Sequence, residues 1–230
     1  MQLTGIGLYT FQEATRLIGI KSGELRRWLH GYPSGQGEKK KAMPPLWNTE
    51  LSAAELDGLS FHDLLEARFV KEFHNHGVSL QAIRIIARHA RELFNSPYPF
   101  TCKRFQTDGK TIFAESLRES GDTELLDLRG KQIVFEKIIR PFLYDGIEFG
   151  VDDRALRWFP DRSKKVVLDP AIAFGKPIVT DIGIRTDILY EAWLAEGKDK
   201  QRAARQFEVP VQAMDAAIRF EEQIEDRLVA

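Results

Sequence analysis

The sequence predicts a mainly α-helical protein with a smaller α+β part. Two observations lead to this fold class. Apolar residues recur at steps of three and four near both ends of the chain, and the middle alternates apolar and polar residues beside turn dipeptides. We expect an N-terminal winged helix-turn-helix over 1–100, a middle section with a hairpin over 101–165, and a C-terminal domain of three helices, helix-turn-helix-like, over 166–230.

Two short helices are expected between Thr10 and His30. Thr10 and Glu13 have the spacing of a capping box, and Gly19 ends the first helix. Ser22 can cap the second helix, which runs to about His30. Two short helices joined by a tight glycine-containing turn are typical of a helix-turn-helix motif.

The segment from Gly31 to Pro45 is rich in Gly, Pro and Lys, and it closes with a possible strand, "PLW". This composition is typical of a mobile wing. Ser60 then caps a further helix that Gly77 stops, and "VSLQAIRIIARHARELF" repeats apolar residues at helical spacing. The prolines of "NSPYPF" place a domain boundary near residue 100.

The middle of the chain indicates short strands. "CKRFQTDGKTIFAESL" has two alternating runs around Asp108-Gly109, which predicts a hairpin. "KQIVFEKIIRPFLYDGIEF" mixes a strand with a short amphipathic helix that ends near Pro141, and "LRWFP" and "KKVVLDP" predict two more strands.

Three helices are expected at the C-terminus, over Thr186–Ala195, Asp199–Gln206 and Val211–Arg227. The last one carries an apolar stripe. We expect the chain to be too short to cover this stripe internally, so that it forms a homodimer interface. The residues expected to form that interface are Met214, Ala217, Ile218 and Ile224.

Composition restricts the class of protein. Hydrophobic residues make up 43% and charged residues 29% of 230, and no apolar run approaches the ~20 residues of a membrane helix. The N-terminus lacks the basic region and cleavage site of a signal peptide, so we expect a cytoplasmic protein. Cys102 is the only cysteine, which excludes an intrachain disulfide and a Cys-rich zinc site. We expect no membrane partner, metal or cofactor.

The charges are divided unevenly along the chain, although the net charge is only −1. Seven cations and three acids lie between Met1 and Thr49, whereas six cations and nine acids lie between Glu191 and Ala230. A basic N-terminus with a helix-turn-helix pattern favours a phosphate backbone as partner over a merely solvated surface. The residues expected to bind DNA are Lys21, Ser22, Arg26, Arg27, Lys39, Lys40 and Lys41.

Other patterns favour ordinary structural roles. Trp28 has helical spacing from Leu25 and is expected in the core rather than stacked on a base. His74 and His76 are two residues apart on a helix, so they face different directions and do not predict a metal site. A nuclease-type carboxylate cluster is a remote alternative to turn chemistry for four acids, Asp145, Glu148, Asp152 and Asp153. No nucleophile motif is present, and we do not expect an enzyme.

Two resemblances to known families cover the ends of the chain. "YTFQEATRLIGIKSGELRRWLHGY", with its run "LRRW", and "LSFHDLLEARFVKEFHNHGVSLQAIR" resemble the DNA-binding part of MerR-like regulators. "VVLDPAIAFGKPIVTDIGIR" and the helices after it are similar to a small bacterial antitoxin domain with the pattern Asp-Pro, Gly-x-Pro and Gly-x-Arg. Asp181-Ile182 departs from that pattern. The matching residues are Asp169, Pro170, Gly175, Pro177, Gly183 and Arg185.

Together the two segments resemble a VapB-type antitoxin of a type II toxin–antitoxin system. The resemblance implies a homodimer that binds operator DNA, represses its own operon and neutralises a PIN-like ribonuclease toxin. The alternative is a stand-alone MerR-like transcription regulator whose middle and C-terminal parts sense a small ligand. The sequence leaves open whether the C-terminal domain itself binds DNA or forms the dimer.

Overall fold

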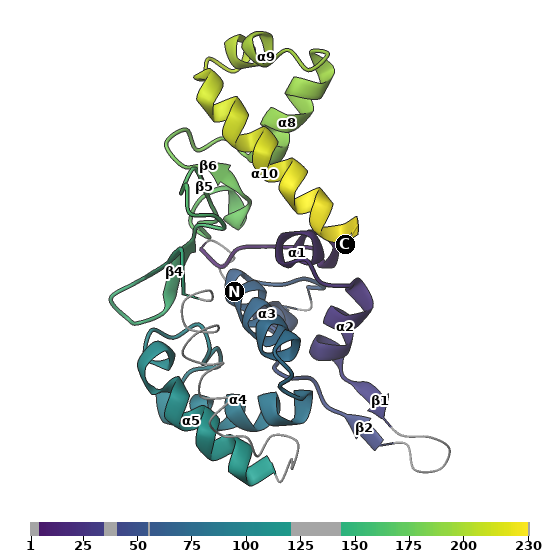
Figure 1. The fold of residues 1–230 in the computed structure, drawn as a ribbon, viewed down its shortest axis with the longest axis vertical. Coiled ribbons are helices and arrows are strands. Elements are labelled where there is room, and N and C mark those ends of the chain that lie inside the picture. Colours follow the sequence, from purple (N-terminus) through teal and green to yellow (C-terminus); the bar gives the residue numbers. More distant parts are fainter. Residues whose placement is uncertain (1–4, 35–40, 55, 121–143, 230) are drawn as a thin grey trace.

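The computed structural model describes residues 5–34, 41–54, 56–120 and 144–229. This part of the chain is mainly helical and contains small two-stranded antiparallel sheets, in agreement with the expected fold class (Figure 1). In Figure 1 the helices of 186–206 lie at the upper end of the molecule and those of 80–94 and 105–120 at the lower end, and the helix of 11–18 lies between them.

The first two helices are α1 (Phe11–Ile18) and α2 (Ser22–His30). The expected capping box at the start of α1 is present, because the Thr10 hydroxyl accepts from the backbone N–H of Glu13 and the Glu13 carboxylate accepts from that of Thr10. The expectation for α2 is wrong by one residue. Its N-cap is Lys21, which makes no side-chain capping bond, and Ser22 is the first helical residue.

A hairpin of β1 (Tyr32–Ser34) and β2 (Lys41–Met43) follows α2 directly. Gly31 makes this close connection possible, because it adopts a φ of 76° and a Cβ at this position would clash with the Met43 carbonyl. The expected strand "PLW" does not form. Its first residue, Pro45, and the preceding Pro44 lack the N–H groups that a strand ladder needs.

A 3-10 turn (Glu50–Ala54) leads to the central helix α3 (Phe61–Asn75), and α4 (Leu80–Phe94) comes next. The Ser60 cap is confirmed by a second capping box, here with Asp63. Gly77, at a φ of 79°, lies just beyond the end of α3, as expected.

The hairpin expected around Asp108-Gly109 is wrong, because Phe105–Ser120 forms one helix, α5. Among the α5 side chains that the structure describes, the buried positions are three and four residues apart: Phe105, Gly109, Ile112 and Ser116. Phe105 packs edge-on against Phe94 of α4, and Ser116 contacts His89 of the same helix. Gly109 therefore lies on the buried side of a helix instead of forming a turn.

Three pairs of short strands occur in the described residues, of which β1–β2 is the first. The second is β3 (Ile147–Phe149) with β4 (Ala155–Trp158), and the third is β5 (Val166–Val167) with β6 (Ile178–Val179). The strands expected at "LRWFP" and "KKVVLDP" are thus confirmed as β4 and β5. A 3-10 turn (Ala173–Gly175) precedes β6. Most of "KQIVFEKIIRPFLYDGIEF", with its expected strand and helix, lies outside the described residues.

The three expected C-terminal helices are confirmed as α8 (Thr186–Ala195), α9 (Lys200–Gln206) and α10 (Val211–Val229). Two main groups of buried apolar residues stabilise the fold. One is formed by α8, α9 and the first half of α10. The other includes residues of α1 to α5 together with Val166, Leu168, Phe220 and Ile224, so it has members on both sides of residues 100 and 166. The division into domains stays a prediction.

Candidate nucleic-acid interface

One face of α2 is exposed to solvent and carries the cations expected to bind DNA. Leu25, Trp28 and Leu29 are buried, so the core reading of Trp28 is confirmed. The opposite face of α2 is exposed to solvent. On it, or at its N-terminal end, lie the exposed residues Lys21, Ser22, Arg26, Arg27 and His30.

The two arginines are each held against an aromatic ring. The Cζ atom of Arg26 lies 4.5 Å from the ring centroid of Phe11, and that of Arg27 lies 4.3 Å from the centroid of Tyr32. Such contacts restrict a guanidinium without removing its hydrogen-bond donors. The guanidinium donors of both arginines therefore stay available to a ligand.

The hairpin stands next to this face. Lys39 and Lys40 lie outside the described residues, and Lys41 begins β2. After the hairpin the chain is fastened to α2 by a bond from the Leu46 N–H to the Trp28 carbonyl, with an N···O distance of 2.8 Å.

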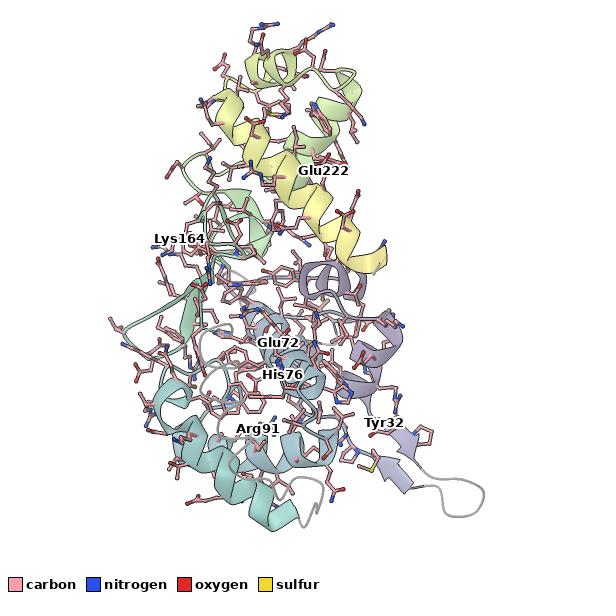
Figure 2. The ribbon with its side chains drawn as sticks, in the orientation of Figure 1. Tyr32, Glu72, His76, Arg91, Lys164 and Glu222 are labelled. Carbon is pink, nitrogen blue, oxygen red and sulfur yellow. The ribbon has the colours of Figure 1, made fainter. Side chains whose placement is uncertain are left out.

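Two arginines of α4 also hold this segment, and sequence reasoning missed them. Arg84 Nη2 donates to the Pro44 carbonyl at 2.9 Å, and Arg91 Nη2 donates to the Leu46 carbonyl at 2.8 Å. Tyr32 and Arg91 are labelled in Figure 2. The spacing of seven residues places both arginines on one face of α4, but spacing alone does not reveal what that face meets.

A buried carboxylate fixes the chain beyond the hairpin. Asp63 accepts from the indole N–H of Trp47 at 2.8 Å, from the backbone N–H of Glu50 at 3.2 Å, and from that of Ser60 at 2.9 Å. Burial raises the pKa of Asp63, although these hydrogen bonds oppose the increase. One side chain of α3 thereby ties three positions of the connection between β2 and α3.

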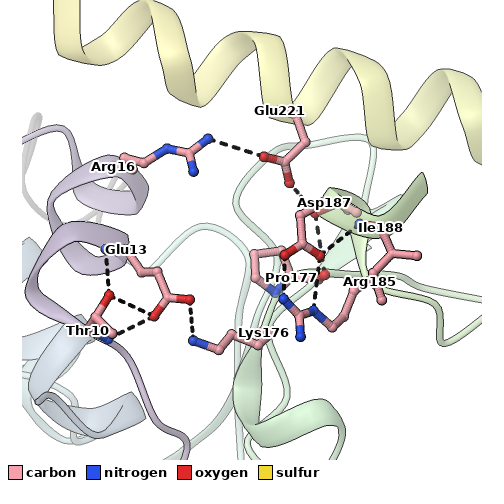
Figure 3. Close-up of polar contacts among 10 residues, drawn as sticks. Thr10, Glu13, Arg16, Lys176, Pro177, Arg185, Asp187, Ile188 and Glu221 are labelled. Carbon is pink, nitrogen blue, oxygen red and sulfur yellow. Dashed lines mark hydrogen bonds and ion pairs between the residues drawn. The ribbon is translucent and has the colours of Figure 1, made fainter. Parts of the chain in front are cut away.

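The N-terminal helices are joined to the C-terminal part by a group of polar contacts (Figure 3). Glu13 pairs with Lys176, and Arg16 lies 3.5 Å from Glu221, which also accepts from Thr186. Burial would raise the pKa of Glu13, but its bonds to Lys176 and Thr10 outweigh it and hold that pKa below the usual value. Burial raises the pKa of Glu221, against the influence of Thr186 and Arg16. The carboxylate that caps α1 therefore also anchors the C-terminal part.

The residues expected to form a dimer interface are buried within a single chain. The expectation that the chain is too short to cover this apolar stripe is therefore wrong. Met214, Ala217 and Ile218 are buried against α8 and α9, and Ile224 is buried in the group that includes α1. The chain covers these four residues internally, and the homodimer and its interface stay predictions.

The acidic residues considered for a nuclease each lie near an arginine. The nitrogen–oxygen distances are 3.3 Å for Arg162 and Asp145, 2.7 Å for Arg157 and Glu148, 3.9 Å for Arg154 and Asp152, and 4.0 Å for Arg104 and Asp153. Among the residues that the structure describes, no group of three His, Cys, Asp or Glu side chains could hold a metal ion. In the same part of the chain, no helix has the length and apolarity needed to span a membrane.

The fold and this site together define a mainly helical protein that presents an arginine-bearing helix beside a β-hairpin. No family model matches the chain. It is 27% identical over 202 residues to a Mycobacterium tuberculosis protein named "Putative antitoxin VapB45", covering 80% of this chain and 82% of that one. A crystal structure of Rv2018 from Mycobacterium tuberculosis has the same fold, with a TM-score of 0.68 and 22% identity over 94% of this chain and 100% of the other.

Proposed function

We propose that this protein is the antitoxin of a type II toxin–antitoxin pair. It neutralises a PIN-like ribonuclease toxin in the cytoplasm, and it binds operator DNA as a homodimer to repress its own operon. The observation that carries the proposal is the similarity, over 80% of the chain, to a protein named as an antitoxin. Such a protein acts by binding, so it requires no catalytic residue or cofactor.

The exposed face of α2 supports the DNA-binding part of the proposal. Arg26 and Arg27 are exposed and lie against the rings of Phe11 and Tyr32, and guanidinium groups bind phosphates and guanine edges well. The hairpin follows α2 directly, and its first residue, Tyr32, contacts Arg27. A helix for the major groove and a wing for the adjacent backbone fit this arrangement.

The test is co-expression with the product of the neighbouring gene. We expect the tagged protein to retain that product on an affinity column and to relieve the growth arrest that the product causes alone. The Arg26→Ala/Arg27→Ala variant is the matched control, since it should keep the partner while losing operator DNA. A neighbouring product that neither binds nor arrests growth would contradict the antitoxin role.

The alternative is a stand-alone MerR-like transcription regulator that senses a small ligand. The α2 face supports it equally, because both functions require DNA binding. Operator binding by a protein that retains no partner in the co-expression experiment would favour this alternative.

A further inference from the structure

The position of the hairpin is set by α4 as well as by its own strand pairing. Arg84 and Arg91 are two helical turns apart on α4, and they donate to the carbonyls of Pro44 and Leu46, which are two residues apart. These carbonyls belong to the segment that leaves β2, where two prolines prevent ladder pairing. The side chains of Arg84 and Arg91 thus supply the hydrogen-bond donors that a neighbouring strand would otherwise give to this segment.

Arg84 differs from Arg91 in a second contact. Its Cζ atom lies 5.9 Å from the ring centroid of Tyr32, the ring that also holds Arg27 at 4.3 Å. Tyr32 is the first residue of β1, and Arg27 belongs to the exposed face of α2. Arg84, Tyr32 and Arg27 therefore connect α4, the hairpin and the proposed recognition helix.

Arginine is not the side chain that would stabilise the folded state most at position 84. Its Nε atom is buried and has no hydrogen-bond partner within the residues that the structure describes. A buried donor without a partner destabilises the folded state, and an apolar side chain of similar volume would avoid this. What an apolar side chain could not do is bond the Pro44 carbonyl and rest on Tyr32 together.

We propose that Arg84 is a positioning residue of the DNA interface, which holds Tyr32 and, through its ring, the guanidinium of Arg27. This inference rests on the proposed DNA binding by α2. Arg84 itself uses its Nη2 donor on the Pro44 carbonyl and acts on DNA through Arg27. The interface consequently extends to α4, about fifty residues further along the sequence than α2.

The substitution Arg84→Lys tests the proposal because it preserves the charge. A lysine ammonium is a point donor without the planar fork, so it cannot make both contacts. The probe is a labelled duplex of the promoter region upstream of the protein's own gene, titrated at several NaCl concentrations. We expect Arg84→Lys to bind it roughly tenfold more weakly and with a salt slope lower by up to ~0.9, the value for one lost phosphate contact.

If the proposal is right, Arg84→Lys weakens DNA binding only through Arg27. A variant that changes both residues distinguishes this from a direct contact between Arg84 and DNA. In the Arg27→Ala background, Arg84→Lys should cause no further loss of affinity or slope. Arg205→Lys, the same change at an exposed position of α9, is the matched control and should bind like the parent.

Two results would overturn the inference: parental affinity for Arg84→Lys, or losses that add up fully in the double variant. A parent protein that does not bind the promoter duplex would instead refute the proposed DNA binding, and this inference with it. Thermal unfolding checks that each variant is folded. If Arg84→Lys does not fold, Tyr32→Leu removes the connecting ring while leaving Arg84 in place. It should lose affinity only when Arg27 is present, and a loss that persists without Arg27 would count against the proposal.

Discussion

Glu66 is a carboxyl group in the interior of the protein. It lies on α3 with no exposed surface, and burial raises its pKa from the usual 4.5 to about 8, although the charge of Arg91 acts in the opposite direction. A group whose pKa is raised by folding binds protons more tightly in the folded state. Its contribution to stability is therefore complete below pH 4.5, decreases as the pH rises toward 8, and is lost above it.

The first prediction concerns this titration. Glu66→Gln removes the ionisable group, so the free energy of unfolding should decrease less between pH 5 and pH 8 than it does in the parent. One pKa unit corresponds to about 1.4 kcal/mol, and we expect a difference on the order of 3–5 kcal/mol across the window. Urea unfolding at both pH values measures it. The prediction is wrong if the free energies of unfolding of the variant and the parent differ by the same amount at pH 5 and at pH 8.

The second prediction concerns Arg26 and Arg27. Both are exposed, so Arg26→Ala and Arg27→Ala should weaken operator binding without unfolding the protein. A lost base contact costs about 1–3 kcal/mol at one operator position, whereas a lost phosphate contact lowers affinity uniformly and reduces the salt slope by ~0.9. Mobility-shift titrations distinguish the two. Unchanged affinity in the double variant would remove both residues from the interface.

At the scale of elements, the sequence predicted correctly those helices whose start and apolar face are determined by residues close together in the chain. The capping boxes at Thr10 and Ser60 span four residues each, so the sequence contains everything that forms them. The C-terminal helices were likewise predictable from caps and periodicity. The candidate DNA-binding arginines on α2 could be named from their place in a two-helix pattern.

What the sequence could not predict depends on partners far along the chain. Gly109 is a turn residue by composition, and only the packing of α5 on α4 makes it helical. The bond from Arg84 to Pro44 joins residues 40 apart, and the pair of Glu13 and Lys176 joins residues 163 apart. The stripe on α10 shows the same limit, because periodicity identifies an apolar face without saying whether its own chain covers it.

The third prediction concerns the hairpin as an element. If Lys39, Lys40 and Lys41 lie along the phosphate backbone as a wing, replacing all three by alanine should reduce the salt slope by up to ~2–3 while operator preference stays nearly intact. Binding to the toxin should not change. A triple variant with the parent's slope would leave Arg26 and Arg27 to hold the duplex without a wing.

At the scale of the whole molecule, the fourth prediction follows from the burial of α10. Ile218 is 5% exposed within the C-terminal core, so Ile218→Glu should bury an unpaired charge in every single chain. We expect a loss of roughly 3–5 kcal/mol in stability and a melting temperature that does not depend on protein concentration. Arg219→Glu, at the exposed neighbouring position, is the matched control and should melt like the parent.

Light scattering on the same two variants adds an independent measurement. If the Ile218→Glu protein has the parent's melting temperature but half the parent's molar mass, Ile218 is a dimer contact after all. Loss of the folded state at every concentration would agree with its place in the core of one chain.

The α10 helix contributes side chains to both main groups of buried apolar residues. Its 19 residues span about 28 Å, with Met214 in the C-terminal core and Ile224 in the core that contains α1. Glu221, which contacts both Arg16 and Thr186, is one of the residues through which α10 meets α1, and Glu225 is another. Because α10 also packs against α8 and α9, and α1 packs against α2, a continuous series of packed helices joins the C-terminal helices to the helix that carries Arg26 and Arg27.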